Sequence, residues 1–498
     1  MRPDYLLAWL LPLLAGGGLW WLANGRHTFR GQGVAMLGAG WIAGVLGAAA
    51  LAGVFGRDDT PHALAAATPS LLAVAALAWL LAALRWFRGR PPASVPASHP
   101  APLLRGLWWL LLVLVVVRFA LLGDEAALRP VFPWDAWSAW AFKPKSWLLL
   151  GQAESYVPMA DWLAQPKLAT RTLATWNYPE LLAWLQVWFA SGAGGWNEPL
   201  VNLAWCGALA AFALAAYGYW RGAGLSPLVA LGLVYALVSL PLVDAHVALA
   251  GYADLWVAVT LGLATLAWSR WLVTRERGQW LLGVGFALCL PALKLEGAIW
   301  LLAFTAVVVV DLIPPRWRGR TGAGVLAALA IVLALGGFSL PLPGLGWVEI
   351  AWGRIAIPAV APFELTWHAV GGAMLESLFT LPNWHLLWYA LPLLALLRWR
   401  VLRDDHAARM LGLLVLLQLA CLFVLFFFTS AAAWAEDFTS VNRLILQIVP
   451  SVFVLVAALV RESRDWGSGI RDARGSVVSR SGARRSSAGA IAPAGGYS

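Results

Sequence analysis

Charged residues are scarce in this chain. Aspartate, glutamate, lysine and arginine make up 12% of its 498 residues, against roughly 25% in an ordinary soluble protein. Hydrophobic residues make up 61%, so the composition excludes a soluble globular protein and predicts an all-α, polytopic helical membrane protein. The net charge of +10 does not indicate nucleic-acid binding, because the arginines fall in loops between apolar runs and in the C-terminal tail, where they set orientation.

Cysteine and metal-binding patterns are also lacking. The three cysteines stand singly inside apolar segments, a spacing that fits neither a disulfide framework nor a metal site: Cys206, Cys289 and Cys421. No His-x-x-x-His or Asp-x-Asp pattern is present, so neither a metal nor another cofactor is indicated. His246, His368 and His385 are therefore expected to be loop or interface residues.

Long apolar runs are what the chain has in abundance. A bilayer core about 30 Å thick needs about 17 to 25 apolar residues per helix, and about thirteen runs approach that length. The first lacks a strongly basic start and an Ala-x-Ala exit, so a retained helix is expected rather than a cleaved signal. The runs lie near 5–23, 33–55, 69–87, 105–122, 199–219, 226–243, 253–272, 279–294, 298–313, 323–340, 384–398, 410–428 and 442–460.

The runs and loops divide the chain into four parts. Residues 1–104 hold extra N-terminal helices, and 105–313 form a central module that contains a first outer loop, 123–198. Residues 314–460 form a C-terminal module, whose outer loop 341–383 is expected to be a pair of surface helices. The tail, 461–498, is rich in Ser, Gly and Arg and is expected to be disordered and cytoplasmic.

Orientation follows from arginines in short loops, which are enriched on the cytoplasmic side. Loops that contain Arg221, Arg275, Arg318 and Arg398 all fall on one side of the membrane, so the loops between them face outward. This assignment requires that Tyr178–Gly192, only about fifteen residues long, is an interfacial or re-entrant helix. Counted as a span, it would place every later arginine cluster outside.

One stretch in the first outer loop combines charge with aromatic rings. Residues 132–147 contain Asp135, Lys143 and Lys145 together with four tryptophans, of which Trp134 and Trp137 flank the carboxylate most closely. Tryptophan favours the membrane–water interface, so a short amphipathic helix broken at the following proline, Pro144, is expected along the bilayer surface. A carboxylate there is unfavourable without partners.

Further polar residues fall at the outer ends of other predicted spans, and this common depth predicts one site built from distant segments. Each also has a plainer interpretation: a helix-ending ion pair for Lys294 and Glu296, a favourable helix N-terminus for Asp254, an interfacial anchor for Arg443, and headgroup contacts for the loop lysines. The segments are Asn177-Tyr178-Pro179-Glu180, Tyr252-Ala253-Asp254, Lys294-Leu295-Glu296-Gly297 and Asn442-Arg443.

The order of these motifs over residues 105–313 resembles the GT-C superfamily of membrane glycosyltransferases. It is most similar to the bacterial branch that includes the aminoarabinose transferases of lipid A and the protein O-mannosyltransferases. The resemblance implies that Asp135 is the catalytic base in the first loop, that Asn177 and Tyr178 close this loop, and that Asp254 and Lys294 line the cavity. This chain departs from the pattern in its roughly three extra N-terminal spans, its lack of a second acid beside Asp135, and Asn177 in place of a lysine.

The resemblance implies inverting transfer of a sugar from a polyprenyl-phosphate carrier to a glycan, lipid or protein acceptor, on the periplasmic side of a bacterial inner membrane. Cations near the leaving phosphate favour such a reaction, and Lys294 and Arg443 lead the candidates, followed by Lys143 and Lys145. Asp135 would take the acceptor proton. Asp254 and Glu296 would hold the cations or contact the sugar, with Tyr252, Trp134 and Trp137 in the cavity.

Two other classes of function stay open. A lipid-linked sugar transporter or flippase would carry charged residues at mid-membrane depth together with broken helices. The charges singled out here fall at one end of the spans, which favours chemistry at the surface. A polymerase or ligase of surface polysaccharide would share the compartment and the lipid carrier but differ in its site.

Overall fold

The computed structural model describes residues 2–24, 28–87, 102–164, 170–342, 346–358 and 361–461. Within these residues the protein is an all-α, polytopic membrane protein, since eight helices are long and apolar enough to cross a bilayer. They are α1 (Pro3–Asn24), α2 (Gln32–Phe55), α3 (Ala63–Phe87), α4 (Pro102–Leu128), α8 (Glu198–Gly222), α11 (Ala253–Thr274), α18 (His406–Phe428) and α20 (Val441–Val460). A ninth span is formed if α9 (Pro227–Val238) and α10 (Pro241–Ala248), which are bent by 63°, are one broken helix.

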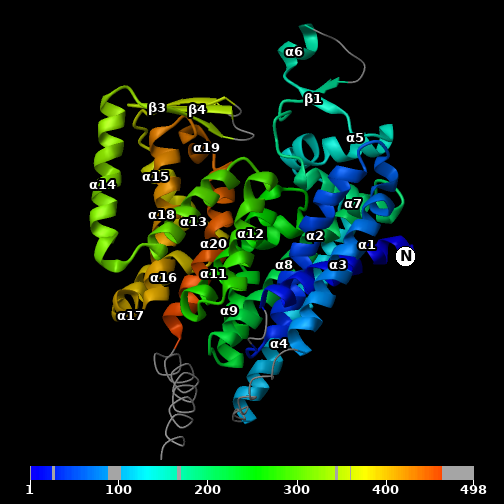
Figure 1. Cartoon of the computed structure of the whole chain (residues 1–498), viewed down its shortest axis with the longest axis horizontal. Coiled ribbons are helices and arrows are strands. Elements are labelled where there is room, and N and C mark those ends of the chain that lie inside the picture. Colours follow the sequence, from blue (N-terminus) through cyan, green and yellow to red (C-terminus); the bar gives the residue numbers. More distant parts are fainter. Residues whose placement is uncertain are drawn as a thin grey trace, which may run out of the picture.

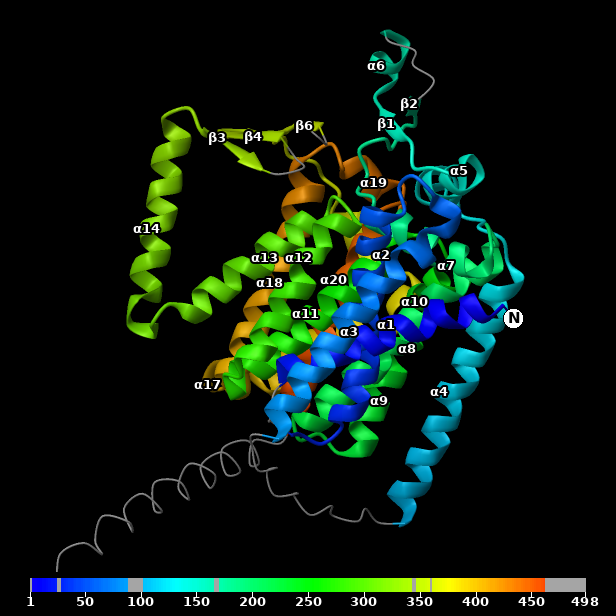
Figure 2. The same ribbon diagram turned by 45° about the vertical axis from the view of Figure 1, so that its right-hand side comes forward.

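Shorter helices complete the bundle and its two ends. Four are apolar but shorter than a full span: α7 (Leu181–Ala193), α12 (Arg277–Leu293), α13 (Gly297–Leu312) and α16 (Leu387–Leu397). Figures 1 and 2 show α14 (Pro315–Ala334) standing apart from the bundle, joined to it at one end by strands. The remaining helices are α5 (Phe142–Leu150), α6 (Met159–Ala164), α15 (Gly371–Leu375), α17 (Trp399–Asp404) and α19 (Ala432–Glu436).

The sequence-based prediction of about thirteen spans exceeds the eight or nine that the described residues provide. The runs near 279–294 and 298–313 form helices of 17 and 16 residues, and the run near 384–398 yields a helix of 11. The run near 323–340 ends early, because Gly336 and Gly337 both have positive φ and terminate the helix after Ala334. The proposed division into four parts stays a prediction, and residues 462–498 of the tail lie outside the described residues.

The outer segment 341–383 is not a pair of surface helices, and this prediction was wrong. Much of it joins a four-stranded antiparallel sheet in the order β3-β4-β5-β6. Prolines and glycines recur every few residues here, too often for a helix to propagate between them, so the segment folds as short strands. They are β3 (Phe338–Leu342), β4 (Gly346–Ala351), β5 (Arg354–Ile357) and β6 (Ala361–Glu364). A separate parallel pair, β1 (Ser155–Val157) and β2 (Thr170–Thr172), lies in the first outer loop.

The aromatic stretch around Asp135 is helical but is not broken at Pro144. A π-helical turn covers Ala136–Trp140, and α5 begins at Phe142. Pro144 therefore lies in the first turn of α5, where its missing N–H removes no intrahelical hydrogen bond. The break predicted at this proline falls instead between the π-helical turn and α5.

The core of the bundle is built around α11. Its first sixteen residues, from Ala253 to Trp268, are all buried, and it packs against α8, α12 and α20. The short helix α7 is also largely buried and packs against α1, α2 and α3. With 13 residues, α7 is too short to span a bilayer. Because most of its residues are buried, it is embedded among the longer helices rather than lying on the surface.

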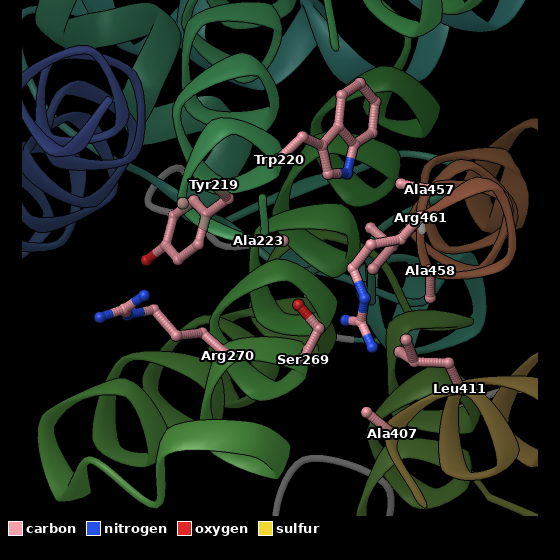
Figure 3. A pocket seen from close by; sticks show the side chains of 12 residues that line it. Tyr219, Trp220, Ala223, Ser269, Arg270, Ala407, Leu411, Ala457, Ala458 and Arg461 are labelled. Atoms are coloured by element: carbon pink, nitrogen blue, oxygen red, sulfur yellow. The ribbon is translucent and has the colours of Figure 1, made fainter. Parts of the chain in front are cut away.

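Arginines gather at one end of the bundle. Arg275 ends α11 and pairs with the buried Asp311, which also contacts His406, and Arg461 follows α20 and pairs with Asp405. A small cavity of about 40 Å³ lies between α8, α11, α18 and α20 at this end, with Arg270 and Arg461 on its walls (Figure 3). Such a volume holds a few water molecules at most, so this cavity is no substrate site.

Candidate functional site

Four charged side chains meet at the end of the bundle opposite these arginines. Asp254 lies in the first turn of α11 and Arg443 in the first turn of α20. Lys294 follows the last residue of α12, and Asp135 precedes the π-helical turn. Although up to 308 residues separate them in sequence, the structure brings all four into contact, as the common depth of their segments predicts.

Two tight backbone approaches position these segments. Gly251 has φ +116, and a Cβ there would lie 2.7 Å from the Cβ of Ala136, so the turn after Asp135 packs directly onto the chain entering α11. Gly297 begins α13, where a Cβ would lie 2.1 Å from the carbonyl oxygen of Leu290. Larger residues at either position would push the segments that carry Asp135 and Lys294 away from Asp254.

Asp254 is the buried centre of the cluster. Its side chain is fully enclosed; Oδ1 accepts from Lys294 Nζ at 2.9 Å, and Oδ2 from Arg443 Nη2 at 3.0 Å. Gln447, one turn further along α20, donates its Nε2 to Oδ1 at 2.5 Å and accepts from Trp300 Nε1, also at 2.5 Å. Two cations and an amide therefore hold one carboxylate, the arrangement that a buried charge requires.

Arg443 connects the buried centre to the accessible side. Its Nη1 donates to Asp135 Oδ2 at 2.5 Å, and 45% of the Asp135 side chain is exposed, against 14% for Arg443. The guanidinium lies over the ring of Tyr252, 4.2 Å from its centre. A cation in the first turn of a helix is opposed by the helix dipole, so Arg443 depends on its two carboxylate partners.

The charges of the cluster do not cancel. Lys294 Nζ also contacts Glu296 Oε1 at 3.1 Å, so three carboxylates, those of Asp135, Asp254 and Glu296, face two cations. Because Lys294 is buried between Asp254 and Glu296, Arg443 is the cation nearest to the accessible side. An anionic group that entered the site would compete with Asp135 for the guanidinium.

The predicted aromatic residues lie beside this cluster. Trp134 and Trp137, on either side of Asp135, are exposed and pack edge to face with ring centres 4.8 Å apart. Tyr178 packs on the ring of Trp140 at 4.7 Å, and the pKa of its hydroxyl is raised by burial and by the nearby Glu296 carboxylate. Asn177 immediately precedes Tyr178 in the loop before α7.

The two loop lysines take other partners. Lys143 is buried, and its Nζ donates to the carbonyl oxygens of Trp176 and Tyr178 at 2.8 and 3.1 Å. Lys145 pairs with Glu198 at 3.0 Å. The structure therefore does not bring either lysine into the charged cluster, and Lys143 fixes the loop that carries Tyr178.

We expect the buried ammonium of Lys143 to make stability depend on alkaline pH. Burial lowers the pKa of Lys143 to about 8, although Glu180 opposes the shift; in the unfolded chain it lies near 10.4. Between these values the unfolded chain binds the extra proton, so the free energy of unfolding should rise with pH, by on the order of 2 kcal/mol.

Thermal unfolding of the purified protein at several pH values between about 7.5 and 10 measures this slope. Lys143→Met should flatten it, and Lys145→Met, which removes a lysine paired at the surface, should preserve it. An equal slope in all three proteins would contradict the assignment to Lys143.

Gln447 and Trp300 belong to the cluster but were not predicted. A signal for Gln447 was present in the sequence, because Arg443, Gln447 and Ser451 recur every four residues in an otherwise apolar helix and so share one face. Ser451 Oγ lies 3.0 Å from Thr265 Oγ1 of α11, which continues the polar contact between the two helices. Trp300 carried no such signal among 33 tryptophans.

Comparison with known proteins gives no further guidance: the chain matches no protein-family model, no curated protein and no solved structure. Within the described ranges, no group of three or more His, Cys, Asp or Glu side chains is arranged to hold a metal ion.

Proposed function

We propose that this chain is a GT-C-type membrane glycosyltransferase that moves a sugar from a polyprenyl-phosphate carrier to a glycan, lipid or protein acceptor at the periplasmic face of a bacterial inner membrane. One observation carries the proposal. Arg443 is shared between the buried Asp254 and the accessible Asp135, at the end of two apolar helices. Transfer from a lipid phosphate requires a cation for the phosphate and a general base for the acceptor, both at the ends of the apolar helices. Arg443 would serve the phosphate, and Asp135 would serve as the base.

In the proposed reaction the donor phosphate replaces Asp135 on Arg443. The guanidinium then stabilises the negative charge that grows on the phosphate oxygens, and the released carboxylate accepts the proton of the acceptor hydroxyl. The acceptor oxygen forms a bond to the anomeric carbon as the bond from that carbon to the phosphate oxygen breaks. The bonding electrons leave with the polyprenyl phosphate, and the anomeric centre is inverted.

Lys294 has an indirect part in this proposal. Its Nζ is enclosed by Asp254 and Glu296, so it fixes the carboxylate that orients Arg443 rather than meeting the phosphate itself. Trp134 and Trp137 offer exposed ring faces beside Asp135, and a sugar ring can pack on such faces.

Mass spectrometry of cell-envelope glycans tests the function directly. Cells that lack the protein should lose one sugar from a defined glycan or lipid, and the unmodified acceptor should accumulate in its place. Expression of the wild-type chain should restore the sugar. Envelope glycans that are unchanged in the deletion strain would count against the proposal.

The proposed orientation predicts that Ser138 and Arg403 face opposite sides of the membrane. In a chain whose three native cysteines are replaced, a cysteine at position 138 should react in intact cells with a membrane-impermeant thiol reagent. One at position 403, beside the arginine-rich end, should react only after the cells are opened. Labelling of both positions in intact cells would refute the topology.

A lipid-linked sugar transporter or flippase is the second candidate, and one observation favours it. Arg118 in α4 pairs with Asp244 in α10 beside the break between α9 and α10, so the charged residues are not confined to the ends of the helices as the sequence predicted. Movement of a lipid-linked sugar across proteoliposomes, unaffected by Asp135→Asn, would identify a transporter. A polysaccharide polymerase or ligase would instead show up as a change in glycan chain length.

A further inference from the structure

A large groove lies on the side of the bundle, away from the charged cluster around Arg443. Its volume is about 950 Å³, and it is bounded by α4, α9, α10, α16 and α20; Figure 2 shows α4 at the edge of the bundle. Ligand sites commonly measure about 300 to 1,000 Å³ and combine apolar walls with a few convergent polar groups. The apolar walls include Leu233, Trp384, Leu391, Leu394, Phe453 and Val456.

The polar end of the groove is built where the span formed by α9 and α10 breaks. Carbonyl groups at the end of a helix have no helical partner, and here Arg118 supplies one: its Nε donates to the Val238 oxygen at 2.8 Å. His385 Nε2 donates to the Ser239 oxygen, also at 2.8 Å. Asp244 pairs with the Arg118 guanidinium, so the polar end has no net charge when His385 is neutral.

Backbone strain marks the same position. His385 has φ +48, a conformation that a side chain with a Cβ rarely adopts and that costs about 1–3 kcal/mol. The adjacent Trp384 is fully buried and donates to the Ser377 carbonyl at 2.9 Å. The surrounding structure thus holds His385 in place at the wall of the groove.

The polar end lies within the apolar part of the span rather than at a helix end. Arg118 stands between the charged residues near the two ends of α4, thirteen positions after Arg105 and six before Asp124, or about 20 and 9 Å at 1.5 Å per residue. The break at Ser239 follows the start of α9, Pro227, by twelve positions, or about 18 Å. Helices of this apolar composition place such positions inside the hydrocarbon core.

We infer that this groove binds a long-chain lipid alcohol, that is, a lipid whose polar end is an uncharged hydroxyl. A phosphate or ammonium headgroup inside the hydrocarbon core is strongly disfavoured, and the paired Arg118 and Asp244 offer no net charge to compensate one. Each is about a quarter exposed, at 27% and 26%, so a hydroxyl can donate to the carboxylate and accept from the guanidinium at once. The leucine-rich walls then take the chain. This inference does not depend on the glycosyltransferase proposal.

Photo-crosslinking of the full-length protein in lipid nanodiscs tests the site. The probe is geranylgeraniol with a diazirine on its chain. We expect labelled peptides from 386–397 and 229–240, and unlabelled geranylgeraniol should compete for the labelling at least about tenfold better than geranylgeranyl phosphate. Equal competition by the alcohol and the phosphate would overturn the inference.

Two variants make the test specific. Ala390 lines the groove, and Ala390→Trp should fill it and lower the labelling about tenfold; Leu302→Trp, on an exposed part of α13 outside the groove, is the matched control. Asp244→Asn leaves the charge of Arg118 without a partner, so geranylgeranyl phosphate should become the better competitor. Unchanged labelling in Ala390→Trp, or unchanged preference in a folded Asp244→Asn protein, would each refute the proposal.

Discussion

Replacement of Asp135 by asparagine is expected to lower sugar transfer by about 10²- to 10⁴-fold, the usual contribution of a general base. The amide oxygen can still accept the hydrogen bond from Arg443, and the side chain is 45% exposed, so the fold and the membrane expression should be unchanged. The loss would then report on proton transfer rather than on stability. Asp135→Glu keeps the carboxylate and should retain more activity than the asparagine variant.

The measurement is the amount of sugar restored to the envelope acceptor when each variant is expressed in the deletion strain. Asp161→Asn, a change at an exposed carboxylate on α6, is the matched control and should behave as the wild type. Full restoration by Asp135→Asn at equal expression would remove Asp135 from its proposed role. It would also shift the balance toward the transporter, for which no base is needed.

Binding of the donor should be retained or strengthened in Asp135→Asn, because the phosphate competes with this residue for Arg443. A carboxylate that leaves the guanidinium must be replaced by an anion of comparable hydrogen-bonding strength, whereas an amide leaves more readily. Loss of transfer with retained donor binding is therefore the pattern that separates a base from a structural carboxylate.

The contacts among Asp135, Asp254, Lys294 and Arg443 could be anticipated from the sequence because a membrane restricts where charge can be placed. Once each apolar run is a helix, a polar residue at its outer end has a known depth, and charges at one depth tend to pair. The partners themselves could not be read from the sequence. Arg443 lies between Asp135 and Asp254 through backbone approaches at Gly251 and Gly297, which are properties of the folded chain.

The positions of the two loop lysines, by contrast, could not be anticipated from the sequence. Lys143 and Lys145 have the same sequence signal, a cation among interfacial tryptophans, yet Lys143 is buried against two carbonyl groups and Lys145 pairs with Glu198. Lys143 is buried because the outer loop folds back, so that the segment before α7 lies against it. Such contacts join residues far apart in sequence and leave no local signal. The sheet β3-β4-β5-β6 was missed for a related reason, since short apolar runs do not distinguish a strand from a helix by periodicity.

The second large effect is expected at Asp254, whose loss leaves two cations without their shared partner. In Asp254→Ala the ammonium of Lys294, only 5% exposed, keeps just the partly exposed Glu296, and Arg443 keeps Asp135 as its one carboxylate partner. Removal of one member of a buried ion pair typically costs about 3 to 5 kcal/mol. The free energy of unfolding of the purified protein in mixed micelles should fall by that amount, with Asp59→Ala, a change in an exposed pair with His62, as the control.

A double variant distinguishes an uncompensated buried charge from simple loss of packing. If the cost in Asp254→Ala comes from the charge left on Lys294, then Asp254→Ala combined with Lys294→Met should recover most of the lost stability, because an apolar side chain replaces the buried ammonium. Arg443 would still be held by Asp135 and by the ring of Tyr252. A double variant less stable than Asp254→Ala alone would mean that packing around Lys294, and not its pairing with Asp254, holds α11, α12 and α20 together at this end of the bundle.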